Sequence, residues 1–208
     1  MLITKTNPGR SNPSRHKRWP PQENIYGTKP TQLPQPTSFI VNSPMTFLAR
    51  APEWMQKLWR TTKWTNATLT KIIDAANSGS LLATGTGAIR NQWGAHYWAF
   101  STTETLKRIC TQNGPIDGNP NNMKAFRASA TYILSALSIL STMEPCITNL
   151  KAPIELHTNC GGLLNLIQAT TINRPSLVLS DHIDIVYQIR YIIRKTNLNI
   201  SFTYTKAI

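Results

Sequence analysis

The sequence predicts an α/β domain in which helices flank a mixed five-stranded sheet, preceded by a disordered N-terminal leader. Two segments, Ile154 to Asn159 and residues 199–206, alternate apolar and polar side chains, as half-buried strands do. Three earlier segments are read as strands from apolar clusters bounded by glycines and turn residues. The segments between the later strands instead repeat their apolar residues at helical spacing. Three strands come in succession before the first of these helices, which predicts an antiparallel meander, and the strands that follow helices should lie parallel to its edge.

Residues 1–44 are predicted to form the disordered leader. They hold eight of the fourteen prolines and six Lys or Arg residues against one Glu. Such a segment cannot bury enough apolar surface to offset the entropy lost on ordering. Its basic run from Ser14 to Pro21 (SRHKRWPP) has two interpretations: a phosphate contact or weak nuclear address, or simply a solvated charge run.

Residues 45–79 are predicted to form a helical lead-in to the main domain at 80–208. A short amphipathic helix should start near Pro52, because apolar residues recur at helical spacing on both sides of it: Phe47, Ala51, Trp54, Met55 and Leu58. This stripe is interpreted either as a core or partner contact or as a stacking platform for bases. A second helix should end at Gly79 and leave Asp74 on the surface.

The main domain should open with three strands. From Leu81 to Phe100, two apolar clusters are separated by glycines and an Asn-Gln pair, which predicts two strands joined by a loop. A third strand is expected from Leu106 to Gln112. The following Asn113-Gly114-Pro115 should close it with a turn.

Two further strands and three helices follow. A continuous apolar stripe predicts a helix from about Asn122 to Thr142, and alternation predicts a strand from Ile154 to Asn159. A short helix should begin at Gly161. Another should begin with Ser180 as its N-cap, and the alternating residues 199–206 should form the last strand.

The charge of the chain favours a polyanionic partner. Twenty-two Lys and Arg residues against nine Asp and Glu give a net charge of +13, which suits nucleic acid, although a basic composition can also serve solubility alone. The three cysteines have neither zinc-site spacing nor a disulfide pattern, so we expect an intracellular protein of the nucleus or cytoplasm. No signal sequence or membrane-spanning stretch is expected.

Four stretches, in this order, carry a resemblance to a known family: Leu81 to Phe100, Gly114 to Leu137 (GPIDGNPNNMKAFRASATYILSAL), Ile154 to Ile167, and Ser180 to Ile208. Together they resemble the ribonuclease H domain of retrotransposon-encoded reverse transcriptases over about residues 68–208. The resemblance implies the same mixed sheet. It also implies that the domain is C-terminally truncated, because the family's histidine loop and final helix would follow Ile208.

The resemblance also implies where catalytic residues should lie. In that family, carboxylates at the strand ends hold two magnesium ions about 4 Å apart for phosphodiester hydrolysis. The first three of these positions fall on Gly85, Ser129 and Asn159, and the fourth would lie beyond Ile208. Magnesium requires charged oxygen ligands, which these three residues do not supply. We therefore expect no catalytic residue, no bound metal and no cofactor.

Other acidic residues are candidates to replace these ligands. Asp74 could be aligned as the first carboxylate, but it would then precede an unusually long hairpin loop. The acids nearest the family positions are Asp117, Glu155, Asp181 and Asp184. Glu155 would lie ~13 Å along the strand from Asn159. Asp181 and Asp184 are better explained as first-turn residues that complement a helix dipole.

In the resembling family, the carboxylates lie in a groove that faces the phosphate backbone. Their loss should leave less negative charge there to offset nearby cations. The expected nucleic-acid contacts are Arg90, Lys124, Arg127 and Lys206, and Arg127 has a second interpretation as the cap of a local surface. Trp93, Tyr97 and Trp98 are candidate stacking residues. In an alternating strand, however, one of each adjacent pair must point into the core.

The first hypothesis is a catalytically inactive ribonuclease H-like remnant of a retroelement. It would bind RNA or an RNA–DNA hybrid weakly, with no membrane partner. One alternative is residual magnesium-dependent cleavage of RNA in RNA–DNA hybrids. The other is a basic structural subunit of a ribonucleoprotein.

Overall fold

The computed structural model describes residues 43–90, 93–116, 124–169 and 182–206. The predicted leader lies outside the described residues except for its last two, Ser43 and Pro44. Asp117, Ser180 and Asp181 also lie outside them.

Three helices precede the sheet: α1 (Pro44–Arg50), α2 (Glu53–Trp59) and α3 (Asn66–Ser78). The helix predicted near Pro52 is α2, whereas α1 was not foreseen as a separate helix. Pro44 is the first residue of α1 and Pro52 is the N-cap of α2. A proline at a helix start loses no intrahelical hydrogen bond. Both prolines are therefore compatible with the helices that begin at them.

The second predicted helix of the lead-in is confirmed by α3. The hydroxyl of its N-cap Thr65 accepts a hydrogen bond from the Thr68 N–H at 3.1 Å. Gly79 ends the helix with φ 73°, the left-handed conformation that favours glycine. Asp74 is exposed, as expected.

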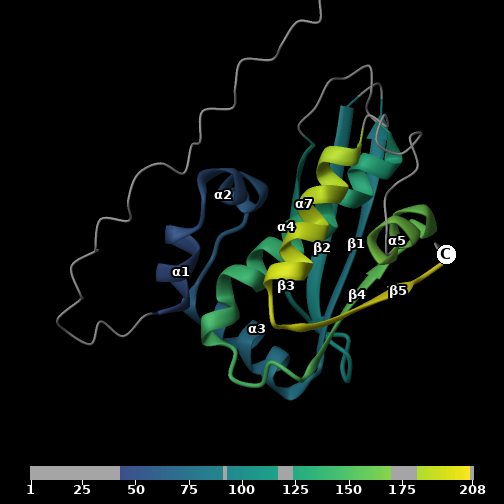
Figure 1. Ribbon diagram of the computed structural model, residues 1–208. Helices are drawn as coiled ribbons and strands as arrows, with labels where there is room; N and C mark the ends of the chain where they lie inside the picture. Colours follow the sequence, from purple (N-terminus) through teal and green to yellow (C-terminus); the bar gives the residue numbers. More distant parts are fainter. Residues whose placement is uncertain (1–42, 91–92, 117–123, 170–181, 207–208) are drawn as a thin grey trace, which may run out of the picture. The chain divides into compact units, whose positions relative to one another are not determined.

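The sheet contains β1 (Leu81–Arg90), β2 (Trp93–Thr102), β3 (Arg108–Pro115), β4 (Pro153–Thr158) and β5 (Asn199–Tyr204), in the order β3-β2-β1-β4-β5 (Figure 1). β1 and β3 each pair antiparallel with β2, whereas β4 pairs parallel with β1 and with β5. This confirms the predicted mixed five-stranded sheet. Because β1, β4 and β5 are parallel, their carboxyl ends meet at one end of the sheet.

The turn predicted at Asn113-Gly114-Pro115 is wrong, because these residues belong to β3. Asn113 pairs with Tyr97 and Pro115 with Ala95, both in β2. β3 lies at the edge of the sheet. A proline is tolerated there, since the outward N–H positions of an edge strand need no partner.

The long helix α4 (Ala125–Met143) packs across β1 and β2 (Figure 1). Every residue from Ala128 to Leu140 is buried, so α4 is a central helix rather than one with a single apolar stripe. It shares one core with α1, α3, α7 (Ile183–Lys195) and the near face of the sheet. The start predicted at Asn122 lies outside the described residues.

Two shorter helical segments and α7 complete the described elements. η2 (Glu144–Cys146) follows α4, and α5 (Gly161–Gln168) is the short helix predicted after β4. The N-cap of α7 is His182, so the prediction that Ser180 caps this helix is wrong. Asp184 is the acidic residue of its first turn and forms an ion pair with Arg127 of α4. No helix among the described residues is both long and apolar enough to cross a bilayer.

Candidate functional site

The three positions that the resemblance assigns to metal ligands lie at the same end of the sheet. Gly85 follows Thr84, which pairs with His157 of β4, and Asn159 comes directly after β4. Ser129 lies in the first turns of α4, where this helix crosses β1. The fold therefore brings these positions to one place, as the resemblance implies.

The space beside Gly85 is filled by the ring of Tyr132. A Cβ atom on Gly85 would lie 2.7 Å from Cγ of Tyr132 and 2.6 Å from the carbonyl oxygen of Tyr97, closer than real Cβ contacts come. Tyr132 is fully buried, and its hydroxyl donates a hydrogen bond to the carbonyl oxygen of His157. Burial also raises the pKa of Tyr132 above its ordinary value. No side chain can extend from position 85 unless this ring moves.

A second glycine brings α4 close to the backbone of β1. Gly87 lies on the same face of β1 as Gly85, because side-chain positions alternate along a strand. A Cβ atom on Gly87 would lie 2.5 Å from the backbone nitrogen of Ser129 and still closer to Ala128. The Gly-Thr-Gly segment thus forms a groove that the first turns of α4 occupy.

The donors at the family positions do not fit a pair of magnesium ions. Gly85 has no side chain, Ser129 is a neutral hydroxyl that is only 4% exposed, and Asn159 is an exposed neutral amide. Magnesium binds through charged oxygens, usually carboxylates. Across the described ranges, no three His, Cys, Asp or Glu side chains gather closely enough to hold a metal ion.

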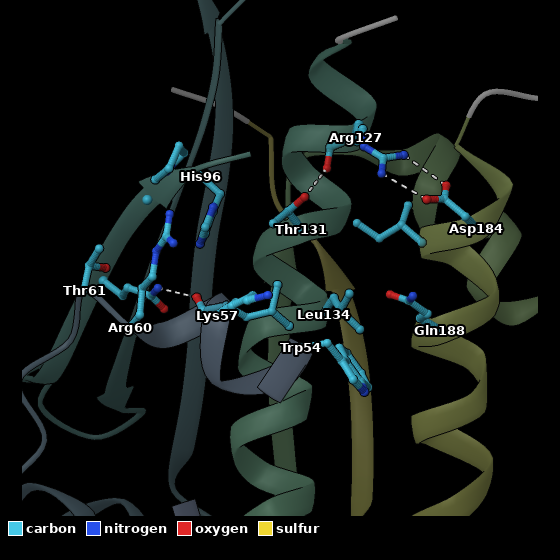
Figure 2. Close-up of a pocket in the computed structure, with 15 residues that line it drawn as sticks. Trp54, Lys57, Arg60, Thr61, His96, Arg127, Thr131, Leu134, Asp184 and Gln188 are labelled. Carbon is cyan, nitrogen blue, oxygen red and sulfur yellow. Dashed lines mark hydrogen bonds and ion pairs between the residues drawn. The ribbon is translucent and has the colours of Figure 1, made fainter. Parts of the chain in front are cut away.

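Asp184, one of the acids weighed as a substitute ligand, forms an ion pair with Arg127. Nη1 and Nη2 of Arg127 each donate a hydrogen bond of 3.0 Å to the carboxylate (Figure 2). Partial burial alone would raise the pKa of Asp184. The hydrogen bonds and charge of Arg127, with the N–H of Ile185, outweigh burial and hold that pKa below its ordinary value. The pair therefore joins α4 to α7.

Glu155 and His157 also interact with each other. Nε2 of His157 lies 2.9 Å from Oε2 of Glu155, two residues earlier on the same face of β4. This face is opposite to the one on which Leu156 is buried. Glu155 is therefore paired within its own strand rather than directed toward the family positions.

The four cations predicted to contact nucleic acid do not gather on one face. Lys124 is the exposed N-cap of α4, and Arg127 is directed at α7. Arg90 is exposed at the end of β1, on the sheet face opposite to α4 because it alternates out of phase with Gly85 and Gly87. Lys206 is exposed just after β5. Only Lys124 and Arg127 belong to the same element.

The aromatic residues of β2 divide as alternation requires. Trp98 is fully buried and its indole N–H donates to Ser135 of α4 at 2.9 Å. Trp93 is 76% exposed and pairs directly with Arg90 across the hairpin. Directly paired residues share one face of a sheet, so Arg90 and Trp93 present a cation and an aromatic ring together.

A basic cavity that sequence reasoning missed lies between α2, β2, β3, α4 and α7 (Figure 2). Its volume is about 230 Å³. Lys57 of α2 and Arg60, which directly follows α2, line one side of the cavity. The Arg127–Asp184 pair lines the opposite side. Three cations against one carboxylate make the cavity electropositive.

The position of Lys57 and Arg60 depends on a polar network beneath α2. Trp98 donates to the Ser135 hydroxyl, which lies 3.1 Å from Oε1 of Gln112 and can donate to it. The side-chain amide of Gln112 in turn donates to the carbonyl oxygen of Leu58. This network joins the last turn of α2 to β2, β3 and α4.

The observed sheet is the mixed, five-stranded arrangement that the resemblance implies. No protein-family model and no curated protein matches the chain. Among solved structures it is similar to a ribonuclease H1 isolated from compost by a metagenomic approach, with 12% identity and a TM-score of 0.48 over 62% of this chain and 85% of that one.

Two further solved structures show a similar arrangement. The ribonuclease H1 of Halobacterium salinarum is 16% identical, with a TM-score of 0.42 over 61% of this chain and 85% of that one. A foamy viral protease-reverse transcriptase solved in complex with double-stranded DNA is 14% identical, with a TM-score of 0.39 over 80% of this chain and 33% of that one. At such identities the likeness concerns the fold alone.

Proposed function

We propose that this chain is a catalytically inactive, ribonuclease H-like protein of retroelement origin that binds nucleic acid weakly and without sequence preference. The observation that carries the proposal is the Tyr132 ring, which fills the space that a carboxylate at position 85 would need. Hydrolysis by paired magnesium ions depends on carboxylates that converge on one point. Here one position is occluded and the other two carry neutral groups.

The charge supports binding to nucleic acid. A net charge of +13 attracts a phosphate backbone independently of its sequence. Lys124 is exposed at the start of α4, and Arg90 is exposed at the end of β1 on the other face of the sheet, where Trp93 offers a ring beside it. We infer that these residues contact RNA or an RNA–DNA hybrid through phosphates rather than base edges.

The test combines binding and cleavage on one labelled RNA–DNA hybrid. Fluorescence anisotropy with the full chain should show binding that weakens steeply between about 50 and 200 mM salt. Changing Arg90→Gln and Lys124→Gln together should reduce the slope of log K against log salt by about 2. With magnesium or manganese, the hybrid should remain uncut.

Metal-dependent cleavage that disappears in Asp74→Asn or Asp117→Asn would overturn the inactive assignment and favour residual hydrolysis. Co-purification with a stoichiometric RNA particle, without affinity for a free hybrid, would instead favour a structural subunit of a ribonucleoprotein. A hybrid affinity unchanged by salt would contradict phosphate-dominated binding.

A further inference from the structure

We propose that the surface between α2 and α7 is a second nucleic-acid site, which binds a single strand. Its bases would stack on Trp54, Tyr187 and Tyr191, and its phosphates would lie near Lys57 and Arg60. This inference goes beyond the function proposed above, because the site involves neither Arg90 nor Lys124 and binds bases by stacking as well as phosphates.

The aromatic part of the site is a hollow of about 230 Å³ lined by Trp54, Tyr187, Gln188 and Tyr191. Trp54 is 41% exposed, Tyr187 49% and Tyr191 59%. The two tyrosines are four residues apart on α7, so they share one helix face. Large apolar side chains that gather on a surface mark interaction sites more often than those that occur singly.

The aromatic hollow adjoins the basic cavity, and Trp54 and Gln188 line both. Figure 2 shows Trp54 next to Leu134 of α4 and facing Gln188 of α7, below the part of the cavity that Arg127 and Asp184 enclose. A nucleic-acid strand that crosses from the aromatic hollow to the basic cavity would contact the rings first and the cations next.

The cations at this surface remain available to phosphates. Lys57 pairs with Glu53 at 3.0 Å, but the two side chains are 56% and 84% exposed. An exposed pair of this kind contributes little energy, so a phosphate can displace the carboxylate. Four residues after Tyr191 on α7, Nζ of Lys195 lies 5.9 Å from the centre of the Tyr191 ring. A cation therefore lies near Tyr191 as well as in the adjoining cavity.

Aromatic rings that adjoin cations match the chemistry of a single strand. Every base has an apolar face that stacks on an aromatic ring, and every nucleotide carries a phosphate. In a duplex the base faces are already stacked on one another, so these rings could not reach them. An apolar protein surface would suit the rings alone. The flanking Lys57, Arg60 and Lys195 favour a polyanion instead.

The first experiment tests the rings. Binding of the full chain to a short fluorescein-labelled oligothymidylate is measured by anisotropy, with Tyr187→Ala/Tyr191→Ala compared with Tyr187→Phe/Tyr191→Phe. The alanine variant should bind about tenfold more weakly or worse, with an unchanged salt slope. The phenylalanine variant should keep its affinity, because stacking needs the ring and not the hydroxyl. Alanine favours helix, so α7 should persist, which circular dichroism checks.

The second experiment tests the cations against a matched pair. Lys57→Gln/Arg60→Gln removes two positive charges from the proposed site. Lys71→Gln/Lys107→Gln removes two from a different cavity, bordered by α3 and the turn between β2 and β3. Only the first pair should weaken oligothymidylate binding markedly, and it should reduce the salt slope by about 1.4.

Three outcomes would overturn the inference. Equal weakening by both charge pairs would show nonspecific attraction. An alanine variant with unchanged affinity would leave a protein as the better occupant of the hollow. Binding of the wild type to the hybrid but not to the single strand would sink this inference and leave the proposed function standing. As a cross-check, the Tyr187→Ala/Tyr191→Ala variant should bind the hybrid as the wild type does.

Discussion

Two regions of the molecule differ in what they leave accessible to a ligand. At the end of β1 and β4, glycines and small α4 residues allow the helix to pack against the strand, and Tyr132 fills the remaining space. Between α2 and α7, by contrast, aromatic rings and cations stay exposed around two adjoining hollows. Sequence resemblance identifies the first region as functional. The second region retains open volume and positive charge, which favours it as the site that a ligand can reach.

The largest expected effect comes from restoring the family's carboxylates. The variant Gly85→Asp/Ser129→Glu/Asn159→Asp should lose about 4 kcal/mol or more of unfolding free energy, because two of the new carboxylates would be forced against Tyr132 and the buried face of α4. Urea denaturation measures this loss. Asn159→Asp alone is the control and should change stability by less than about 0.5 kcal/mol, since Asn159 is exposed. A stable triple variant that cleaves a hybrid would show that the first region is open after all.

A smaller but cleaner test uses single methyl groups. Gly87→Ala should lower the unfolding free energy by about 3 kcal/mol, because the new Cβ would meet the backbone of α4 rather than a flexible side chain. Gly162→Ala in α5 is the matched control. Its Cβ would have no atom within 4 Å, so stability should stay equal or rise slightly. Equal values for the two variants would contradict the close packing of α4 on β1.

The second region can be disturbed separately through the network beneath α2. Ser135→Ala should cost about 2 kcal/mol, because it leaves the buried indole N–H of Trp98 without its partner. Amide hydrogen exchange in α2 should also become faster. Ser138→Ala is the control: this buried hydroxyl donates only to the Leu134 carbonyl one turn earlier. If both variants behave alike, the network does not hold α2 in place.

The smallest effect expected is a pH dependence that arises outside both regions, at Glu144. Partial burial would raise the pKa of Glu144, but hydrogen bonds from Thr196 and Asn197 outweigh it and lower that pKa. A depressed carboxyl pKa contributes stability that is complete above the unfolded value of about 4 and is lost as the pH falls through the folded value.

Urea titrations at neutral and acidic pH measure this contribution. Glu144→Gln should remove about 1 kcal/mol near neutral pH and flatten the acid slope of the unfolding free energy. Glu104→Gln, at an exposed position in the turn between β2 and β3, is the control and should leave the slope unchanged. An acid slope that Glu144→Gln does not alter would show that these hydrogen bonds do not favour the ionised carboxyl.

Most of the fold could be predicted from periodicity. The alternation of Ile154, Leu156 and Thr158 and the helical spacing of Leu69, Ile72 and Ala76 each place a buried face, and the structure confirms both. The errors arose where residue type and context disagree. Pro115 is typical of turns but is allowed on an edge strand, and Ser180 is a good N-cap residue, yet α7 begins at Ile183.

Less of the candidate site could be predicted. The sequence shows that Gly85 lacks a carboxylate but not that Tyr132, 47 residues later, fills the space, because that contact depends on how α4 crosses β1. The exposed ring of Trp54 was foreseen only as one of two interpretations of a helical stripe. Tyr187 and Tyr191 could have been predicted as a surface pair, because they are two aromatic residues four apart on the polar face of a helix.

Calorimetric titration of the full chain with magnesium shows whether the family positions can hold this ion. Only the heat of dilution is expected, both for the wild type and for Asn159→Ala. A saturable binding heat in the wild type that Asn159→Ala abolishes would contradict this expectation.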